Sequence, residues 1–400
     1  MKHFSNFDFQ MKTEIIFGKD AELRTAEMIK KYGGTKVMIV MDGGGFIKAS
    51  GLFDRVAKNL TENGLPFVEL EGVQPNPRKS LVLKGLDLAK AEGVDFVLAI
   101  GGGSTMDTAK GIALGMKYDN WWDFFNGSVP EEIGLVGAIP TMAGTGSETS
   151  GSAVIYDDID TKMKLGNMFP HIRCVFAIEN PEITYSLPKF QTGAGAADIF
   201  AHSFDSYMKG DDSYLGDKFS EATMSAAVKY GPVAVNDPTN YEARAELMLT
   251  SSFAHNDVCR IGKGPGPQGA GHNMESQLTA LLDTAHGAGL SVIMPAYLEY
   301  IVEHDESTIG RVAQLAVRVF GVEADPQNPK DVALRGIKKF REWLVGLGMP
   351  QTIAELKRPL TDEEIDDLCA KCWLNPDGSL ACYGHIPAEG IREIYKSVNE

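Results

Sequence analysis

The sequence has no long apolar run. None of its segments reaches the ~18 uninterrupted apolar residues of a membrane-spanning helix. The first twenty residues have no apolar core followed by a small-residue cleavage site, so we do not expect a signal peptide. Instead, residues 13–18 ("TEIIFG") predict an edge strand that ends in a turn. The 400 residues carry a formal net charge of -16, which opposes binding to nucleic acid or to an anionic membrane.

Cysteine is also scarce, with five residues in the whole chain. This odd, small number argues against a disulfide framework and fits the reducing cytoplasm. The order Cys369, Cys372, Cys382, His385 has the spacing of some structural zinc sites. We favour another interpretation, in which residues 361–373 form a helix that begins with a Thr361–Glu364 capping box. In that case the cysteines of the helix are small apolar residues near the core and not zinc ligands.

The distribution of apolar residues divides the chain near residue 190. Before this point, strand patterns at 36–42, 66–72, 94–100 and 135–141 alternate with helix patterns at 53–64, 78–93 and 101–116. Such alternation predicts a largely parallel sheet with helices on both faces. Beyond residue 190, the apolar residues have almost entirely helical spacing. We therefore predict an α/β domain over residues 1–190 and an all-helical domain over residues 191–400.

The dinucleotide fingerprint G-x-G-x-x-G is absent, but Gly101–Gly103 and Ser104 join a predicted strand to a predicted helix. Free N–H groups at such a helix start can bind a phosphate, although an ordinary tight turn has the same composition. Asp42 ends an earlier strand, where an acidic side chain favours the ribose hydroxyl of NAD. Gly43, Gly44 and the nearby Lys48 instead suit the 2′-phosphate of NADP. The choice between NAD and NADP stays open, with a lean towards NAD.

Four residues of the predicted helical domain have the chemistry of a metal site. Asp198 and His202 are spaced i, i+4, so a helix places them on one face. A straight helix would separate His272 from His286 by about 21 Å. They converge only if the helix after His272 ends and the chain turns back before His286. One carboxylate and three imidazoles would suit Fe²⁺ or Zn²⁺, whereas unrelated structural histidines are the alternative.

Several motifs together resemble one enzyme family along essentially the whole chain. They are "TEIIFG", "PNP" at residues 75–77, "GGGSTMDTAK", "PTMAGTGSETS", "ENPEITYSLP", "AADIFAH" and "GHNME" followed by "TAHGAGL". The set resembles the iron-containing (group III) alcohol dehydrogenases, and more narrowly the branch of butanol dehydrogenases and broad aldehyde reductases. The resemblance implies a Rossmann-like nucleotide-binding domain followed by an all-helical metal-binding domain, the architecture of dehydroquinate synthase.

The resemblance also implies specific site residues. The family's four metal ligands fall on Asp198, His202, His272 and His286. Its pyrophosphate loop falls on Gly102, Gly103, Ser104 and Asp107, and Asp42 lies where NAD-preferring members carry an aspartate. Other cofactor-lining positions match Asn76, Thr141, Thr145, Ser147, Lys164 and Leu187. The implied activity is reversible hydride transfer between NAD(P)H and a small aldehyde, with Fe²⁺ or Zn²⁺ as metal and a homodimer as the assembly.

The sequence departs from the family at several positions. Relatives usually carry a histidine near the nicotinamide where this chain has Ser276. We expect Ser276, the ribose hydroxyl or a water to relay the proton instead, with His255 as a weaker candidate. The loop at residues 262–271 is unusual, Asn180 replaces an aspartate and Asp205 a common glutamate. These differences leave two alternatives, a degenerate member that binds metal and dinucleotide, and a lyase of the dehydroquinate synthase type. The pair Trp121–Trp122 predicts packing in preference to a substrate pocket.

Overall fold

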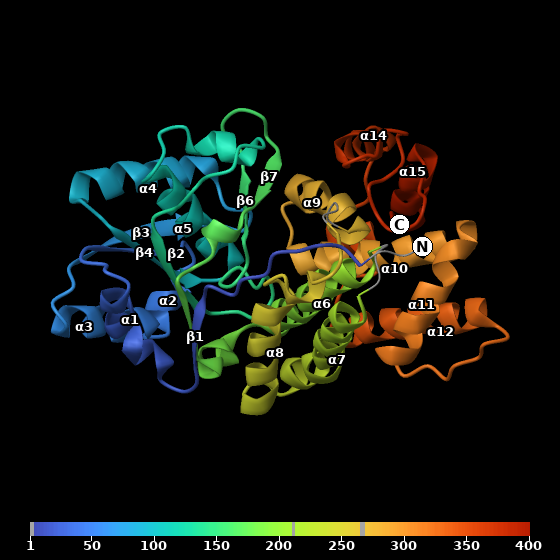
Figure 1. Ribbon diagram of the computed structural model, residues 1–400, viewed down its shortest axis with the longest axis horizontal. Coiled ribbons are helices and arrows are strands. Elements are labelled where there is room, and N and C mark those ends of the chain that lie inside the picture. The colour runs from blue at the N-terminus through green and yellow to red at the C-terminus, as the bar shows by residue number, and fades with distance from the viewer. Residues whose placement is uncertain (1–3, 210–212, 265–268) are drawn as a thin grey trace. The chain divides into compact units, whose positions relative to one another are not determined.

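The computed structural model describes residues 4–209, 213–264 and 269–400. The chain forms two compact units, shown as ribbons in Figure 1. The first unit is Gln10–Ser186. The second is Leu187–Glu400 together with the described part of Met1–Phe9. The backbone N–H of Ser5 donates to the carbonyl of Gly262 at 3.0 Å, which ties this N-terminal segment to the second unit.

The first unit contains a parallel sheet of six strands in the order β1-β8-β5-β4-β2-β3. The strands are β1 (Glu14–Phe17), β2 (Val37–Asp42), β3 (Phe67–Val73), β4 (Phe96–Gly101), β5 (Leu135–Pro140) and β8 (Phe176–Glu179). The strands predicted from the sequence are confirmed, and β1 is an edge strand as expected. All the strands are parallel, so their carboxyl ends lie at one edge of the sheet.

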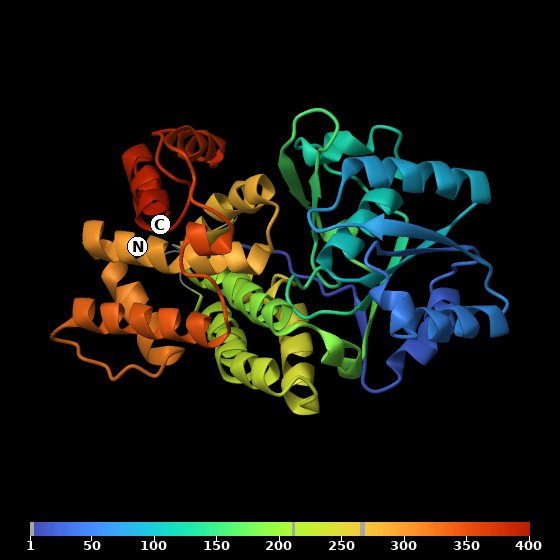
Figure 2. The same ribbon diagram turned by 180° about the vertical axis from the view of Figure 1, so that it is seen from behind.

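Helices cover both faces of this sheet (Figures 1 and 2). In β4, Phe96, Leu98 and Ile100 belong to a core with α1 (Thr25–Lys31) and α3 (Leu52–Glu62). The alternate residues Val97 and Ala99 face a second core with α4 (Lys79–Glu92) and α5 (Gly103–Gly115). A strand buried on both faces needs apolar residues at every position, which explains the unbroken apolar runs in the sequence.

A two-stranded antiparallel hairpin, β6 (Ser152–Tyr156) and β7 (Lys164–Met168), was not predicted from the sequence, and neither were the sheet strand β8 and the helix α1. The second strand, "KLGNM", has only two apolar residues and an internal glycine, so it lacks a strand pattern. The loop between the strands is held by Asp157. Its carboxylate accepts from the N–H groups of Ile159, Asp160 and Thr161.

In its described residues the second unit is helical, as the sequence predicted, and contains no strand. Its long helices are α6 (Lys189–Tyr207), α7 (Tyr214–Asn236), α8 (Tyr241–Ala254), α9 (Ala270–Leu282), α10 (His286–His304), α11 (Glu306–Arg318) and α12 (Pro329–Gly346). Three shorter ones follow, α13 (Ile353–Leu356), α14 (Asp362–Lys371) and α15 (Ala388–Ser397). The predicted capping box of Thr361 and Glu364 is present at the start of α14. No helix in the described ranges combines the length and the apolar character needed to cross a membrane.

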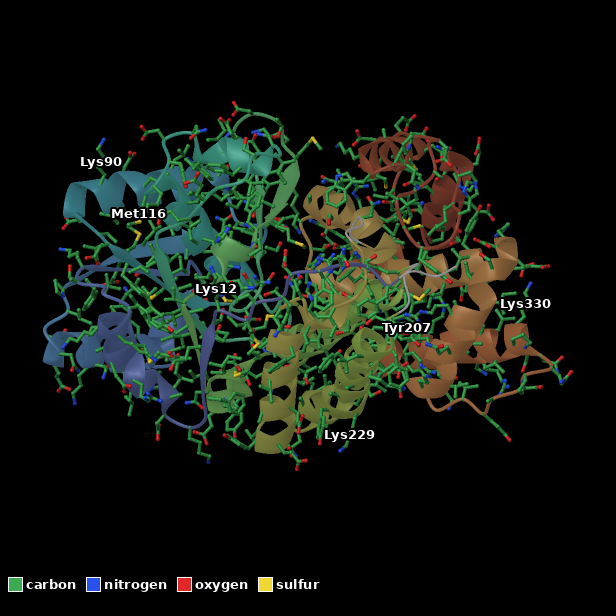
Figure 3. The ribbon with its side chains drawn as sticks, in the orientation of Figure 1. Lys12, Lys90, Met116, Tyr207, Lys229 and Lys330 are labelled. Atoms are coloured by element: carbon green, nitrogen blue, oxygen red, sulfur yellow. The ribbon has the colours of Figure 1, made fainter. Side chains whose placement is uncertain are left out.

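The end of α6 is fixed by a buried ionic cluster, and Figure 3 labels its residue Tyr207. Arg311 donates through Nε to the carbonyl of Tyr207 at 3.1 Å, and Lys263 donates to the carbonyl of Ser206 at 2.8 Å. Both cations pair with the carboxylate of Asp217, at 2.5 Å and 2.7 Å. Cations at a helix C-terminus satisfy carbonyls that have no partner within the helix. The cluster therefore holds in place the helix that carries Asp198 and His202.

Candidate metal centre and cofactor-binding loops

The structure brings the four predicted metal-binding residues together in the second unit. Asp198 and His202 lie one turn apart on α6, and His272 lies in the first turn of α9. Helix α9 ends at Leu282, and Asp283 then adopts a left-handed conformation with φ of 51°. The chain reverses there, and α10 begins at His286. This turn brings His272 and His286 together despite their separation in sequence.

The distances define a compact cluster. Nδ1 of His202 lies 3.6 Å from Oδ1 of Asp198, and Nε2 of His286 lies 3.8 Å from the same oxygen. The rings of His202 and His272 are 4.8 Å apart, and those of His272 and His286 are 5.1 Å apart. One potential ligand atom from each of Asp198, His202 and His272 lies within 4.8 Å of the others. These three residues form the one group of metal-ligand type found among the described residues.

The polar atoms of this cluster fit a divalent cation. Asp198 and His272 are each only 3% exposed. Within the described ranges, Nδ1 of His202 and Nε2 of His272 have no hydrogen-bond partner. Burial, reinforced by the neighbouring imidazoles, holds the pKa of His202 well below its usual value, so its ring is neutral and has a lone pair to donate. Neutral imidazoles with one carboxylate suit Fe²⁺ or Zn²⁺.

The two residues expected to move a proton lie beside this cluster. His255 ends α8, and its ring stacks on His202 with the centroids 4.0 Å apart. Ser276 lies one turn after His272 on α9, and its hydroxyl donates to the His272 carbonyl at 2.7 Å. The Ser276 proton is thus engaged with its own helix. Both residues stay predictions as proton donors.

The predicted pyrophosphate loop lies at the carboxyl end of β4 in the first unit. Gly102 is the N-cap residue of α5, so the helix starts directly where the strand ends. Unpaired N–H groups at such a start favour an anion. A Cβ atom at Gly103 would lie 2.5 Å from Cγ2 of Thr145, so only glycine allows the two loops to approach this closely. The structure thus places Gly102, Gly103 and Ser104 next to a second predicted cofactor loop.

The remaining predicted cofactor residues follow other strands of the sheet. Asn76 follows β3, and Thr141 follows β5 with its N–H donating to the carbonyl of Gly101 at 3.1 Å. Lys164 begins β7. Leu187 belongs to the second unit, so its place beside the others stays a prediction. In open parallel sheets, ligands bind at the carboxyl ends of the strands.

Asp107 and Lys110, one turn apart on α5, hold the segment that follows β5. The hydroxyl of Ser147 donates to one oxygen of Asp107 at 2.7 Å, and the N–H of Val154 donates to the other at 2.9 Å. Lys110 is fully buried and donates to Ser147, Ser150 and Ser152 at 2.7–3.0 Å. Burial raises the pKa of Asp107 and lowers that of Lys110. No role of Lys110 was predicted from the sequence, although a lysine within an apolar helix is a usable signal.

The partners of Lys48 bear on the conflict between Asp42 and Lys48. Its ammonium pairs with Glu69 at 2.7 Å and also with Glu71, both on the neighbouring strand β3. These two carboxylates raise the pKa of Lys48 above its usual value. By contrast, Oδ1 of Asp42 is buried and accepts no hydrogen bond from the part of the chain that the structure describes. Asp42 is therefore available to a ligand hydroxyl, whereas Lys48 is already engaged with carboxylates.

Two weaker patterns are settled by the structure. Cys369, Cys372, Cys382 and His385 form no metal-ligand group in the described ranges, and the five cysteines are all free thiols. Trp121 and Trp122 pack with Phe125, the second pair of rings stacking at 4.9 Å, which confirms the packing interpretation. Residues 265–268 of the unusual loop lie outside the described residues.

Comparison with known proteins identifies the family. The sequence matches "Iron-containing alcohol dehydrogenase" over residues 12–181 and "Fe-containing alcohol dehydrogenase family, C-terminal" over residues 192–399. Together these matches cover most of the chain, which belongs to the family of iron-containing alcohol dehydrogenases. The family resemblance that the sequence motifs suggested is thus confirmed.

Individual relatives cover nearly the whole chain. The NADH-dependent butanol dehydrogenase A of Clostridium acetobutylicum is 37% identical over 98% of this chain and 99% of its own length. The NADPH-dependent aldehyde reductase of Escherichia coli is 31% identical over 88% of this chain and 89% of its own. The crystal structure of an NADH-dependent butanol dehydrogenase A from Thermotoga maritima superposes with a TM-score of 0.90 at 32% identity, covering 100% of both chains.

Proposed function

We propose that this protein reversibly interconverts a small aldehyde and its primary alcohol, using NADH and a divalent metal ion. The observation that carries the proposal is the buried group of Asp198, His202 and His272, with His286 beside it, in a chain of this family. The named activities of butanol dehydrogenase and aldehyde reductase relatives support the substrate class. A lyase of the dehydroquinate synthase type is disfavoured, since both halves of the chain match the dehydrogenase family.

Each group of residues has a separate task in this proposal. Asp198, His202, His272 and His286 hold the metal, Fe²⁺ or Zn²⁺, which when bound supplies a Lewis acid for a carbonyl oxygen. Gly102, Gly103 and Ser104 at the start of α5 bind the pyrophosphate. The remaining predicted residues at the strand ends, Asn76, Thr141, Thr145, Ser147 and Lys164, line the dinucleotide, and Leu187 is proposed to do the same. Asp107 acts through the hydroxyl of Ser147.

We propose NADH in preference to NADPH. Asp42, Lys48, Glu69 and Glu71 together carry three negative charges and one positive charge, so this region is net negative. A 2′-phosphate near Asp42 would meet this negative charge, and Lys48 would have to leave two carboxylates to compensate for it. A ribose hydroxyl, in contrast, can donate to the free oxygen of Asp42.

The nucleotide preference is tested by changing these charges. The triple variant Asp42→Gly, Glu69→Gln, Glu71→Gln removes the repulsion and frees Lys48. We expect the ratio of kcat/KM with NADH to kcat/KM with NADPH to fall at least about tenfold, which corresponds to about 1.4 kcal/mol. The control Glu92→Gln breaks a surface pair with Lys36 and should leave the ratio unchanged. An unaltered ratio in the triple variant would show that these charges do not select the nucleotide.

The activity itself is tested with metal-stripped protein reloaded anaerobically with Fe²⁺ or Zn²⁺. We expect reloading to restore NADH oxidation in the presence of butyraldehyde or another short aldehyde. The second candidate function, a degenerate member that binds both cofactors without turnover, is motivated by Ser276 and its bond to the His272 carbonyl. A folded protein with metal and NADH bound but no turnover on any aldehyde of the panel would favour this candidate.

Three further features stay proposals. The stacking of His255 on His202 supports His255 as the group that moves a proton, in place of the missing family histidine at position 276. The homodimer implied by the family resemblance is tested by light scattering during size-exclusion chromatography. The five free thiols support a cytoplasmic location.

A further inference from the structure

The same short spacing occurs twice in the helical unit. On α6, Asp205 follows His202 by three residues, and on α9, Glu275 follows His272 by three residues. Residues three apart share a helix face. Each of these two helices therefore presents a histidine and a carboxylate together. The carboxylate on α6 contacts a histidine of α9, and the carboxylate on α9 contacts a histidine of α10.

The first carboxylate belongs to Asp205. Its Oδ2 lies 2.5 Å from Nδ1 of His272, and both side chains are buried. With Nδ1 engaged in this way, Nε2 is the ring nitrogen left without a hydrogen-bond partner among the described residues.

The second carboxylate belongs to Glu275, whose side chain is completely buried. Its Oε2 lies in direct contact with Nδ1 of His286, the first residue of α10, although no hydrogen bond joins the two atoms in the described residues. Nε2 of His286 is the atom that lies 3.8 Å from Asp198. Each of the two C-terminal histidines therefore has Nδ1 against a carboxylate.

Both carboxylates fit because a glycine faces them. A Cβ atom at Gly269 would lie 2.2 Å from Oδ1 of Asp205, and one at Gly289 would lie 2.6 Å from Oε1 of Glu275. Contacts this short are not tolerated, so a side chain at either glycine would displace the carboxylate. Gly269 lies at the end of the unusual loop, which connects this loop with the aspartate that replaces a common glutamate at position 205.

We propose that Asp205 and Glu275 are positioning residues of the metal centre, which fix His272 and His286 with Nε2 directed at the metal. A carboxylate on Nδ1 sets the tautomer and ring orientation of a ligating histidine and increases its basicity. The arrangement links three helices in series, from Asp205 of α6 to His272 of α9, and from Glu275 of α9 to His286 of α10. This inference rests on the proposed function, because it assumes that a metal binds at the cluster.

The experiment measures Zn²⁺ affinity directly, by competition with a chromogenic chelator. Asp205→Asn and Glu275→Gln keep the size of each side chain and remove its charge. We expect each to weaken Zn²⁺ binding by about 10–100-fold. Affinity for NADH, which the first unit is proposed to bind, should stay unchanged. Glu303→Gln, a surface change on α10 that breaks a pair with Lys330, is the matched control.

A second variant guards against simple loss of folding. Gly289→Ala retains both carboxylates and adds a good helix former, but its methyl group would overlap both Cγ2 of Thr279 and Oε1 of Glu275, so these side chains must shift. We expect weaker Zn²⁺ binding here too, and an altered visible absorption spectrum when Co²⁺ replaces Zn²⁺. Wild-type Zn²⁺ affinity in all three variants would overturn the positioning role and leave the proposed function intact. A wild-type protein that binds no metal would overturn the proposed function and this inference with it.

Discussion

Replacing Asp198 with alanine should lower kcat/KM for metal-dependent aldehyde reduction by about 10³-fold or more, because a lost Lewis acid removes several kcal/mol of transition-state stabilisation. Asp198 is the one carboxylate in the proposed ligand set, and its Oδ1 lies within 4 Å of both His202 and His286. Without it, the proposed ligand set would consist of imidazoles alone, with no negative charge to attract a dication. Steady-state rates after anaerobic reloading with Fe²⁺ or Zn²⁺ give the measurement.

The prediction needs controls for the fold and for the cofactor. NADH binding should persist in Asp198→Ala, because the pyrophosphate loop belongs to the first unit. His304→Ala removes an exposed imidazole that stacks on Tyr300 at the far end of α10, and it should leave turnover unchanged. His272→Ala should match Asp198→Ala. If either ligand variant keeps its full rate after metal reloading, the metal assignment is wrong.

The elements of the fold could be predicted because they depend on local patterns. Apolar runs at residues 36–42 and 94–100 became the central strands β2 and β4, since a strand covered on both faces is apolar throughout. The reversal that unites His272 with His286 was also accessible, because the helix pattern stops before "DTAH" and two glycines follow. The hairpin β6–β7 was missed, since its second strand is too polar to show a strand pattern.

Side-chain partners were the part that sequence could not supply. From its residue type alone, Lys48 suits a phosphate. The structure shows that its ammonium instead pairs with Glu69 and Glu71 on strand β3. Asp205 was recognised only as a departure from the family, and its contact with His272 spans 67 positions in sequence. Such pairs depend on which helices pack together and at what register. The chemistry of a residue can be inferred from its type, whereas its partner requires the tertiary structure.

Lys110→Met should destabilise the first unit by about 3–5 kcal/mol, because it leaves several buried oxygen acceptors unpaired at about 1–3 kcal/mol each. Lys110 is 0% exposed, and its ammonium donates to the carbonyls of Ser147, Ser150 and Ser152. Methionine has a similar length but no donor. It would leave those oxygens unpaired beside the buried carboxylate of Asp107. Urea denaturation of the two proteins gives the difference in the free energy of unfolding.

The same substitution should weaken NADH binding, because Lys110 holds the segment that contains Ser147 and continues the Thr145 loop. Lys117→Met breaks an exposed pair with Glu132 and should cost less than about 1 kcal/mol, so it controls for loss of charge alone.

The double variant Asp107→Asn, Lys110→Met should be more stable than the sum of the single effects predicts, since neither charge is then left alone. Strict additivity would show that the two residues act independently. A Lys110→Met protein as stable as Lys117→Met would show that the buried ammonium does not hold the loop.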